Sequence, residues 1–159
     1  MRKRFLALTA ALLVAIILPA AVFAHWPVAN RHSYISQRYW TGHRAYDLAA
    51  PSGTEVVPIR SGKVIFAGWK SNCGGYQVWV SHGNGFYTAY YHLSKIQSWR
   101  GEYVKDQTTK IGRVGMSGCA TGPHVHTEAW RGKPWASGSY RISPWPYIKT
   151  GYWLPYQYR

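Results

Sequence analysis

The chain has 159 residues, which is enough for one ordinary domain and excludes a large multidomain protein. Its 19 lysines and arginines against five acidic residues give a net charge of +14 at pH 7, an excess that favours an anionic partner. No repeat, coiled coil or low-complexity tract is visible, so solenoid and fibrous architectures are excluded as well.

The first 24 residues have the organisation of a secretory signal peptide. A basic segment, Arg2 to Arg4, precedes an apolar stretch from Leu6 to Leu18, and Val22-Phe23-Ala24 has the small residues of a cleavage site. We therefore expect a protein that is secreted or held in the cell envelope. An uncleaved membrane anchor is the alternative, because residues 5–24 are about long enough to cross a bilayer.

Residues 25–159 keep 16 basic and five acidic residues, a net charge of +11. Outside a cell, such a surface fits anionic wall polymers or lipid headgroups better than nucleic acid. A well-solvated surface without a specific partner is the alternative. We expect a monomer.

Beyond residue 24 the pattern is that of short strands rather than helices. No apolar segment has a 3.6-residue period, and short runs rich in Val, Tyr, Trp and Phe are bounded by turn residues. These runs cover residues 63–69, 76–82, 86–93, 110–114 and 124–130. His82-Gly83-Asn84-Gly85 predicts a hairpin, with His82 as a hydrogen-bonded loop residue. We predict a mainly β single domain built on an antiparallel sheet, sandwich-like or open-barrel-like, with long glycine-rich loops.

The composition divides the exported part into three segments. Residues 25–40 form an N-terminal lead-in, and residues 41–130 form the core of the domain. Residues 131–159 are dense in Pro, Trp and Tyr and are predicted to form an extended aromatic tail packed on the sheet. Those aromatic side chains could instead bind a polymer chain.

Two cysteines, Cys73 and Cys119, lie in separate glycine-rich loops. Disulfides persist outside the cytosol, so in an exported chain we expect these two to pair. The bridge would close a long loop, worth up to about 4 kcal/mol in the chain-entropy model. Two free thiols are the alternative.

The segment 122–128 carries the strongest chemical signal. As a strand, it would direct His124 and His126 to the same face, because alternate side chains share a face. His43 and Asp47 lie far upstream. Two adjacent imidazoles with a distant His and Asp are the donors of a zinc site that keeps an open position for water. The pattern therefore predicts a metalloenzyme.

A further histidine belongs to the same hypothesis. Alternation along residues 86–93 puts Thr88, Tyr90 and His92 on one face of a strand. On this basis we expect His92 to face the same groove as His126.

The order of these motifs resembles that of the lysostaphin-like zinc endopeptidases, which cut peptidoglycan peptides. The resemblance extends over nearly ninety positions, most of the exported chain. The matching blocks are residues 42–54, 61–64, 80–85, 90–93, 111–115 and 118–128.

Carried over position by position, the resemblance implies that His43, Asp47 and His126 hold one zinc ion. It implies that His92 and His124 are unligated catalytic histidines, one acting as general base and the other stabilising the oxyanion or protonating the leaving amine. The implied function is a secreted zinc endopeptidase that hydrolyses peptide bonds in peptidoglycan stem peptides or cross-bridges.

Three positions depart from the family pattern. Ala45 replaces the usual glycine, and Thr127 replaces a large apolar residue that would face away from the metal. Residues 104–109 lack a usual glycine, so that turn can differ. Glu128 falls on the His126 face, and we expect it to orient a ligand or to pair with an arginine.

Two other functions are compatible with parts of the pattern. A non-catalytic relative could bind the wall or activate another hydrolase, although such relatives typically lack zinc ligands. A cupin-like metalloenzyme also uses a His-x-His pair, but it would leave Asp47 unexplained.

Overall fold

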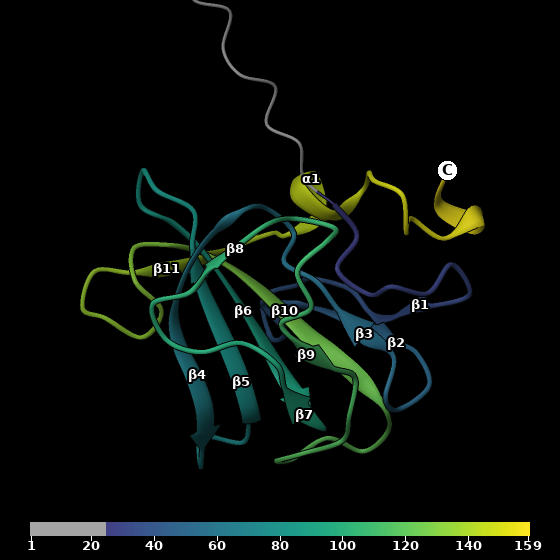
Figure 1. Cartoon of the computed structure of the whole chain (residues 1–159), viewed down its shortest axis with the longest axis horizontal. Coiled ribbons are helices and arrows are strands. Elements are labelled where there is room, and N and C mark those ends of the chain that lie inside the picture. The colour runs from purple at the N-terminus through teal and green to yellow at the C-terminus, as the bar shows by residue number, and fades with distance from the viewer. Residues whose placement is uncertain (1–24) are drawn as a thin grey trace, which may run out of the picture.

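The computed structural model describes residues 25–159, and antiparallel strands make up most of its regular structure (Figure 1). The predicted signal peptide, residues 1–24, lies outside the described residues. Within residues 25–159, no helix has the length and apolar character needed to cross a membrane.

A large antiparallel sheet forms the body of the domain. Its strands, in spatial order, are β1 (Tyr34–Gln37), β2 (Tyr46–Ala49), β10 (His124–Arg131), β6 (Phe86–Leu93), β5 (Gly75–Ser81), β4 (Gly62–Lys70) and β8 (Tyr103–Val104). An eighth strand, β11 (Tyr140–Ile142), pairs with the end of β10 beyond its contact with β2. The predicted mainly β, single-domain antiparallel fold is confirmed.

A smaller sheet covers one face of the large one. It contains β3 (Glu55–Val56), β9 (Gly112–Arg113) and β7 (Lys95–Ile96). Four of the five predicted runs are strands of the large sheet, but 110–114 contributes only the two-residue β9. The core lies between the layers, where Leu48 and Tyr90 of the large sheet are buried with Val56 of the small one.

The opposite face of the large sheet carries a second, smaller apolar cluster. Trp79, Ala89 and Tyr91 form it, with Ile65 and Phe66 packed against them. Since strand side chains alternate between faces, the residues of β6 divide between the two clusters: Tyr90 lies in the core and Tyr91 on the other face. The candidate site is on this second face.

The final segment is more structured than the extended tail that its composition predicted. Besides β11 it contains α1 (Trp145–Ile148), which begins after Pro144, and the 3₁₀ helix η1 (Tyr156–Tyr158). Ile148 and Leu154 are buried in the core. The Trp26 N–H donates to the Thr150 carbonyl, so α1 lies close to the start of the described chain (Figure 1).

The turn at residues 104–109 closes without the glycine that the family pattern has there. Gln107 takes a left-handed conformation, with φ of 56°. Its Oε1 accepts the Tyr152 N–H at 2.7 Å, which ties the turn to the C-terminal segment. A side-chain hydrogen bond thus accompanies a backbone conformation that glycine usually adopts.

Candidate metal centre

Three of the predicted donor side chains meet at one point on the open face of the sheet. In the antiparallel pair β2–β10, Asp47 lies directly opposite His126, and His43 precedes β2 by three residues. The His126 Nδ1 lies 2.8 Å from the Asp47 Oδ1, and the His43 Nε2 lies 3.1 Å from the Asp47 Oδ2 and 3.3 Å from the His126 Nδ1. One donor atom from each residue falls within 4.8 Å of the others.

The spacing of these atoms fits a small cation. Zinc ligands sit about 2.0–2.2 Å from the ion, so two ligands of a tetrahedral site are roughly 3.3 Å apart. The three separations, between 2.8 and 3.3 Å, are close to this value. Two neutral imidazoles and one carboxylate are also a donor set that zinc accepts.

Hydrogen bonds at the outer nitrogens orient the two imidazoles. The His43 Nδ1 donates to the Arg38 carbonyl at 3.1 Å, which leaves its Nε2 with a lone pair toward Asp47. The His126 Nε2 faces the Glu128 Oε1 at 3.5 Å, which leaves its Nδ1 for the same centre. Such outer partners fix the tautomer and the ring position of metal-binding histidines.

Glu128 is at the centre of a buried polar network behind His126. Its side chain is 2% exposed, and the Arg141 Nη1 lies 2.9 Å from its Oε1. Its Oε2 accepts hydrogen bonds from the Tyr91 hydroxyl at 2.6 Å and the Trp130 indole at 2.7 Å. Both roles expected for Glu128, orienting a histidine and pairing with an arginine, are therefore present in one place.

The carboxylates on both sides of His126 change its protonation. Burial lowers the pKa of His126, but its hydrogen bonds to Asp47 and Glu128 and the charges of both raise it to about 9. The pKa of Asp47 is lowered: burial opposes its ionisation, and the neighbouring imidazoles outweigh that effect. The negative charge of these carboxylates, which strengthens proton binding at His126, would equally favour the binding of a metal cation beside it.

His92 reaches this face by a route that alternation does not predict. Thr88 and Tyr90, expected on its face, are fully buried in the core, so that part of the prediction is wrong. On β6, Tyr91 and His92 together lie opposite the single residue Gln77 of β5, which makes a β-bulge. His92 takes a left-handed φ of 63°, and the bulge turns its side chain to the face of Tyr91.

His92 and His124 stand together beside the donor cluster. Their ring centroids are 4.8 Å apart, and the His92 ring is 5.8 Å from that of His126. The Nδ1 of His92 donates to the Ser117 carbonyl and that of His124 to the Gly122 carbonyl, each at 2.8 Å. Both rings therefore keep a lone pair on Nε2, and the His124 Nε2 lies 3.8 Å from the Asp47 Oδ1. Burial lowers the pKa of His92, which keeps its ring neutral at neutral pH.

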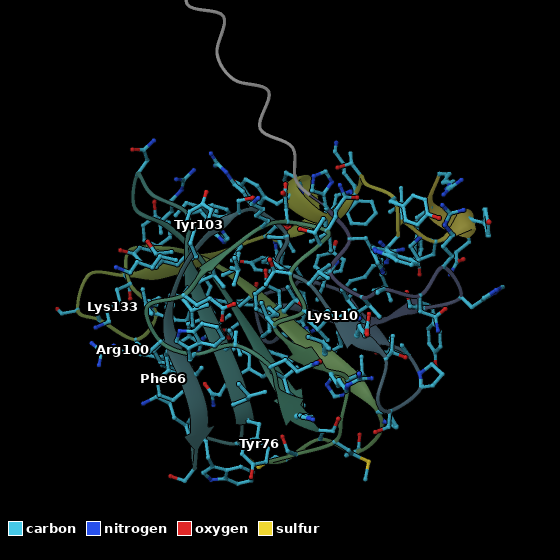
Figure 2. All side chains as sticks on the ribbon, in the orientation of Figure 1. Phe66, Tyr76, Arg100, Tyr103, Lys110 and Lys133 are labelled. Carbon is cyan, nitrogen blue, oxygen red and sulfur yellow. A yellow bond between two sulfur atoms is a disulfide. The ribbon has the colours of Figure 1, made fainter. Side chains whose placement is uncertain are left out.

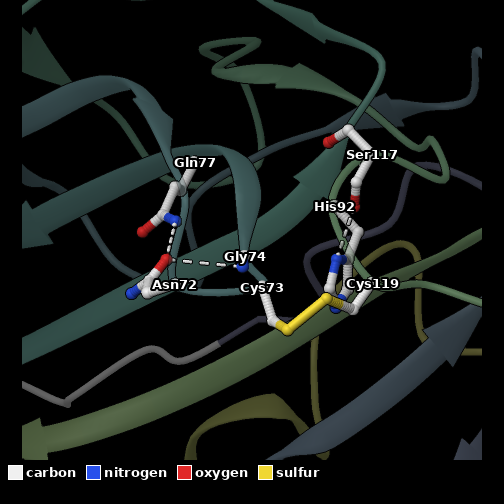
Figure 3. Close-up of a disulfide and its surroundings, with 7 residues drawn as sticks. All are labelled: Asn72, Cys73, Gly74, Gln77, His92, Ser117 and Cys119. Carbon is white, nitrogen blue, oxygen red and sulfur yellow. Dashed lines mark hydrogen bonds between the residues drawn. A yellow bond between two sulfur atoms is a disulfide. The ribbon is translucent and has the colours of Figure 1, made fainter.

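The cysteines form the predicted bridge, and the alternative of two free thiols is wrong. Cys73 and Cys119 are joined, with their Cα atoms 4.8 Å apart (Figure 3). The Cys119 N–H donates to the Cys73 carbonyl at 2.9 Å, and Ser117, in the same loop, holds the His92 ring. A Cβ on Gly118 would lie 2.1 Å from the Cys73 carbonyl oxygen, so only glycine permits this approach.

The centre is open on two sides. A cleft of about 180 Å³ includes Gly74, His92, His126 and Arg141 in its lining. A second depression, of about 350 Å³, is lined by residues that include Gln37, Asp47 and His124. An extended chain could therefore cross the donor cluster from one depression to the other.

Comparison with known proteins identifies the family. The profile of "Peptidase family M23" matches residues 41–137, more than half of the chain. The chain belongs to peptidase family M23. The resemblance inferred from the motifs is thereby confirmed.

The curated relatives of this M23 chain include a peptidoglycan endopeptidase and lysostaphin. It is 40% identical over 93 residues to the peptidoglycan DD-endopeptidase ShyA of Vibrio cholerae, covering 58% of this chain and 21% of ShyA. It is 36% identical over 109 residues to lysostaphin of Staphylococcus simulans, covering 68% of this chain and 22% of lysostaphin. The chain thus matches about a fifth of the length of these relatives.

Solved M23 structures have the same fold. The structure of lysostaphin from Staphylococcus simulans matches with a TM-score of 0.68 at 30% identity, over 82% of this chain and 54% of that one. A zinc-containing peptidase from Vibrio cholerae matches with a TM-score of 0.62 at 31% identity, over 68% of this chain and 36% of that one.

The sequence alone did not identify the residues that surround His126. Tyr91 falls in the matching block 90–93 but was given no role, and Trp130 and Arg141 belong to no chemical motif. Only the strand register, in which Tyr91 lies opposite His126, brings the first of them to the site. Arg141 comes from β11, a strand that the sequence did not predict.

The Glu128 network generates a prediction about metal affinity. We expect Glu128→Gln to lower zinc affinity by roughly 10–100-fold, because the His126 ring loses the carboxylate behind it. Competition with a chelating dye measures this affinity, and circular dichroism checks that the fold is retained. Glu55→Gln is the matched control, since Glu55 pairs with Lys110 away from the site. Equal zinc affinity in the two variants would contradict the assignment.

The disulfide generates a second prediction. Reduction should lower the melting temperature by roughly 10 °C, because a bridge across 46 residues stabilises by about 4 kcal/mol in the chain-entropy model. Peptidase activity should fall with it, since the loop that carries the Ser117 carbonyl loosens and His92 loses its position. Zinc content should not change, because none of the three donors lies in that loop. A reduced protein with full activity would show that the bridge does not position His92.

Proposed function

We propose that this chain is a secreted zinc endopeptidase that hydrolyses peptide bonds in peptidoglycan stem peptides or cross-bridges. The observation that carries the proposal is the arrangement of five residues on one sheet face. His43, Asp47 and His126 present donor atoms within 4.8 Å of one another, and the rings of His92 and His124 stand beside them.

Each residue has a distinct part in this proposal. Zinc held by His43, Asp47 and His126 would supply Lewis-acid polarisation of the peptide carbonyl and activation of water. One imidazole at the site, that of His92 or His124, accepts the proton of the attacking water at its Nε2. The other histidine stabilises the oxyanion or donates a proton to the leaving amine.

Several observations favour this function over the alternatives. A non-catalytic relative would be expected to lack donors, whereas all three converge here. A cupin-like site would not use Asp47, which is an integral part of this cluster. The related ShyA is named a peptidoglycan DD-endopeptidase, and a related Vibrio cholerae structure is described as zinc-containing, which supports both the substrate class and the metal.

An anionic partner is part of the proposal, and one basic depression is the best place for it. About 510 Å³ in volume, it is lined by residues that include Lys63, Arg100 and Lys133. Arg100 and Lys133 lie near one another outside β4 in Figure 2. No ion pair among residues 25–159 involves any of the three side chains, so their charges are available to wall phosphates or carboxylates.

Catalysis is tested with purified peptidoglycan. The wild-type protein should release new amino termini, which mass spectrometry identifies together with the bond cleaved. We expect His92→Ala and His124→Ala to keep zinc and to lose about 10²–10⁴-fold in rate, the usual contribution of a positioned acid or base. His32→Ala, a change at an exposed histidine, is the control. Near-normal turnover by either site variant would remove that residue from the mechanism.

Wall binding is tested by neutralising the basic depression. Replacing Lys63, Arg100 and Lys133 by Gln should weaken binding to a poly(glycerol phosphate) chain several-fold and reduce the salt dependence of binding. The control replaces Lys95, Lys105 and Lys149, which removes the same charge from scattered exposed positions. Equal weakening in both triple variants would mean that net charge, and not this depression, holds the polymer.

A further inference from the structure

An aromatic depression adjoins the metal-site cleft. It has a volume of about 520 Å³, and its lining residues are Trp69, Lys70, Ser71, Asn72, Trp79 and Trp135. Asn72 and Trp135 also line the cleft that contains His92 and His126, so the two hollows share a wall. The indoles of Trp79 and Trp135 in one hollow next to the candidate site suit a ligand with flat faces.

The indole rings are held in place but remain accessible. Trp135 is 54% exposed, and its ring packs against that of Trp130, with centroids 5.5 Å apart. Trp69 pairs with Tyr76 in the sheet and packs edge-on against it, so its ring lies on the face opposite to Trp79. Trp79 is buried at the base, where its indole N–H donates to the Gln77 Oε1 at 2.9 Å. The hollow therefore presents ring surface without needing to rearrange.

Lys70 adds a positive charge to this aromatic wall. Its ammonium nitrogen lies 5.0 Å from the centroid of the Phe66 ring and 5.3 Å from that of Trp79, within range of cation–π attraction. None of the ion pairs found in residues 25–159 involves Lys70. The cation is thus positioned by rings and free to meet an anionic group of a ligand.

Asn72 adds a fixed hydrogen-bond donor on the shared wall. Its Oδ1 accepts from the Gln77 side chain at 2.8 Å and from the Gly74 N–H at 3.3 Å (Figure 3). Gln77 is itself fully buried and held by Trp79. Because the amide oxygen is engaged twice, the amide NH₂ must point the other way. No acceptor for it is found among the described residues.

We propose that this hollow is a subsite for an N-acetylated hexose ring of the glycan strand that carries the stem peptides. The proposal rests on the proposed function and names the part of the substrate bound beside the cleaved peptide. The C–H face of a pyranose ring packs on indole, an acetamido carbonyl accepts from the Asn72 amide, and a carboxylate attached to the sugar through the stem pairs with Lys70.

A peptide side chain fits this hollow less well. Wall peptides are built largely from Gly, Ala, Glu and diamino acids, whose side chains are small or charged and offer no broad apolar face. The lining also combines aromatic faces with a donor, a hydroxyl at Ser71 and a cation. A sugar with ring, amide and hydroxyl groups satisfies both kinds of contact at once, whereas a purely apolar ligand would leave the polar groups unpaired.

The test compares two substrates that differ only in sugar. One is the cross-linked disaccharide-peptide obtained from sacculi with a muramidase, and the other is the same cross-linked peptide freed of sugar by an amidase. Trp135→Ala should raise KM for the sugar-bearing substrate about tenfold more than KM for the sugar-free peptide, the size of one good aromatic contact. Because Trp135 also lines the metal-site cleft, the result is taken from the ratio of the two KM values and not from either value alone.

Trp99→Ala is the matched control, because Trp99 is 66% exposed and lines neither hollow. It should not affect either substrate. Trp135→Tyr, which keeps an aromatic face, should recover part of the loss. An equal loss on both substrates, or none on either, would overturn the sugar assignment.

A binding measurement separates this proposal from the proposed function. Calorimetry with an uncross-linked disaccharide-peptide, compared with its sugar-free peptide, needs no hydrolysis. Tighter binding of the sugar-bearing ligand by wild type, lost in Trp135→Ala, would support the subsite even if no peptide bond were cleaved. Equal binding of the two ligands by wild type would refute it even in an active peptidase.

Discussion

The candidate site depends on the register of β10 between its two neighbours. In this register His126 lies opposite Asp47 of β2 on one side and opposite Tyr91 of β6 on the other. Two candidate metal ligands are therefore neighbours, and Tyr91, which donates to Glu128, lies beside them. A shift by one residue would send His126 and Glu128 into the core and bring Val125 and Thr127 to the open face. Because Val125 and Thr127 are fully buried, core packing and site geometry enforce the same register.

Charge burial behind His126 is the second constraint. A carboxylate that is 2% exposed is costly to bury alone, and Glu128 meets this cost with a guanidinium, a hydroxyl and an indole N–H around it. Burial raises the pKa of Glu128, but its hydrogen bonds to His126 and Tyr91 and the charge of His126 lower it overall. The carboxylate therefore stays ionised, and its position fixes the ring that faces Asp47.

The open face of the large sheet combines groups with different binding chemistry. The donor cluster lies at one end of β10, and the aromatic hollow adjoins its cleft. Toward the other end of β10, a row of paired residues crosses the sheet from Trp130 through Tyr87 and Ser81 to Lys63. Lys63 lines the basic depression. A polymer that carries peptides, sugars and anionic groups could contact all three regions of one surface.

The sequence by itself predicted the β class and the disulfide partners, and it singled out the five polar residues that meet on the open face. The signals used were short runs of β-branched and aromatic residues, an exported pair of cysteines, and a His-x-His with a distant His and Asp. Each can be recognised in the sequence without knowing which strands pair. The sequence also correctly predicted that Thr127 points away from the donor cluster, because side chains alternate regularly between the two faces along β10.

Tertiary structure decided what alternation could not. The bulge at Tyr91–His92 turns His92 away from the face of Tyr90, and a bulge depends on the pairing of two strands rather than on either one. The partners of Glu128 come from β6, β10 and β11, and the indoles of the aromatic hollow come from β5 and the segment after β10. Contacts between residues so distant in the chain arise only when strand order and register are fixed, because local sequence signals describe each strand but not its neighbours.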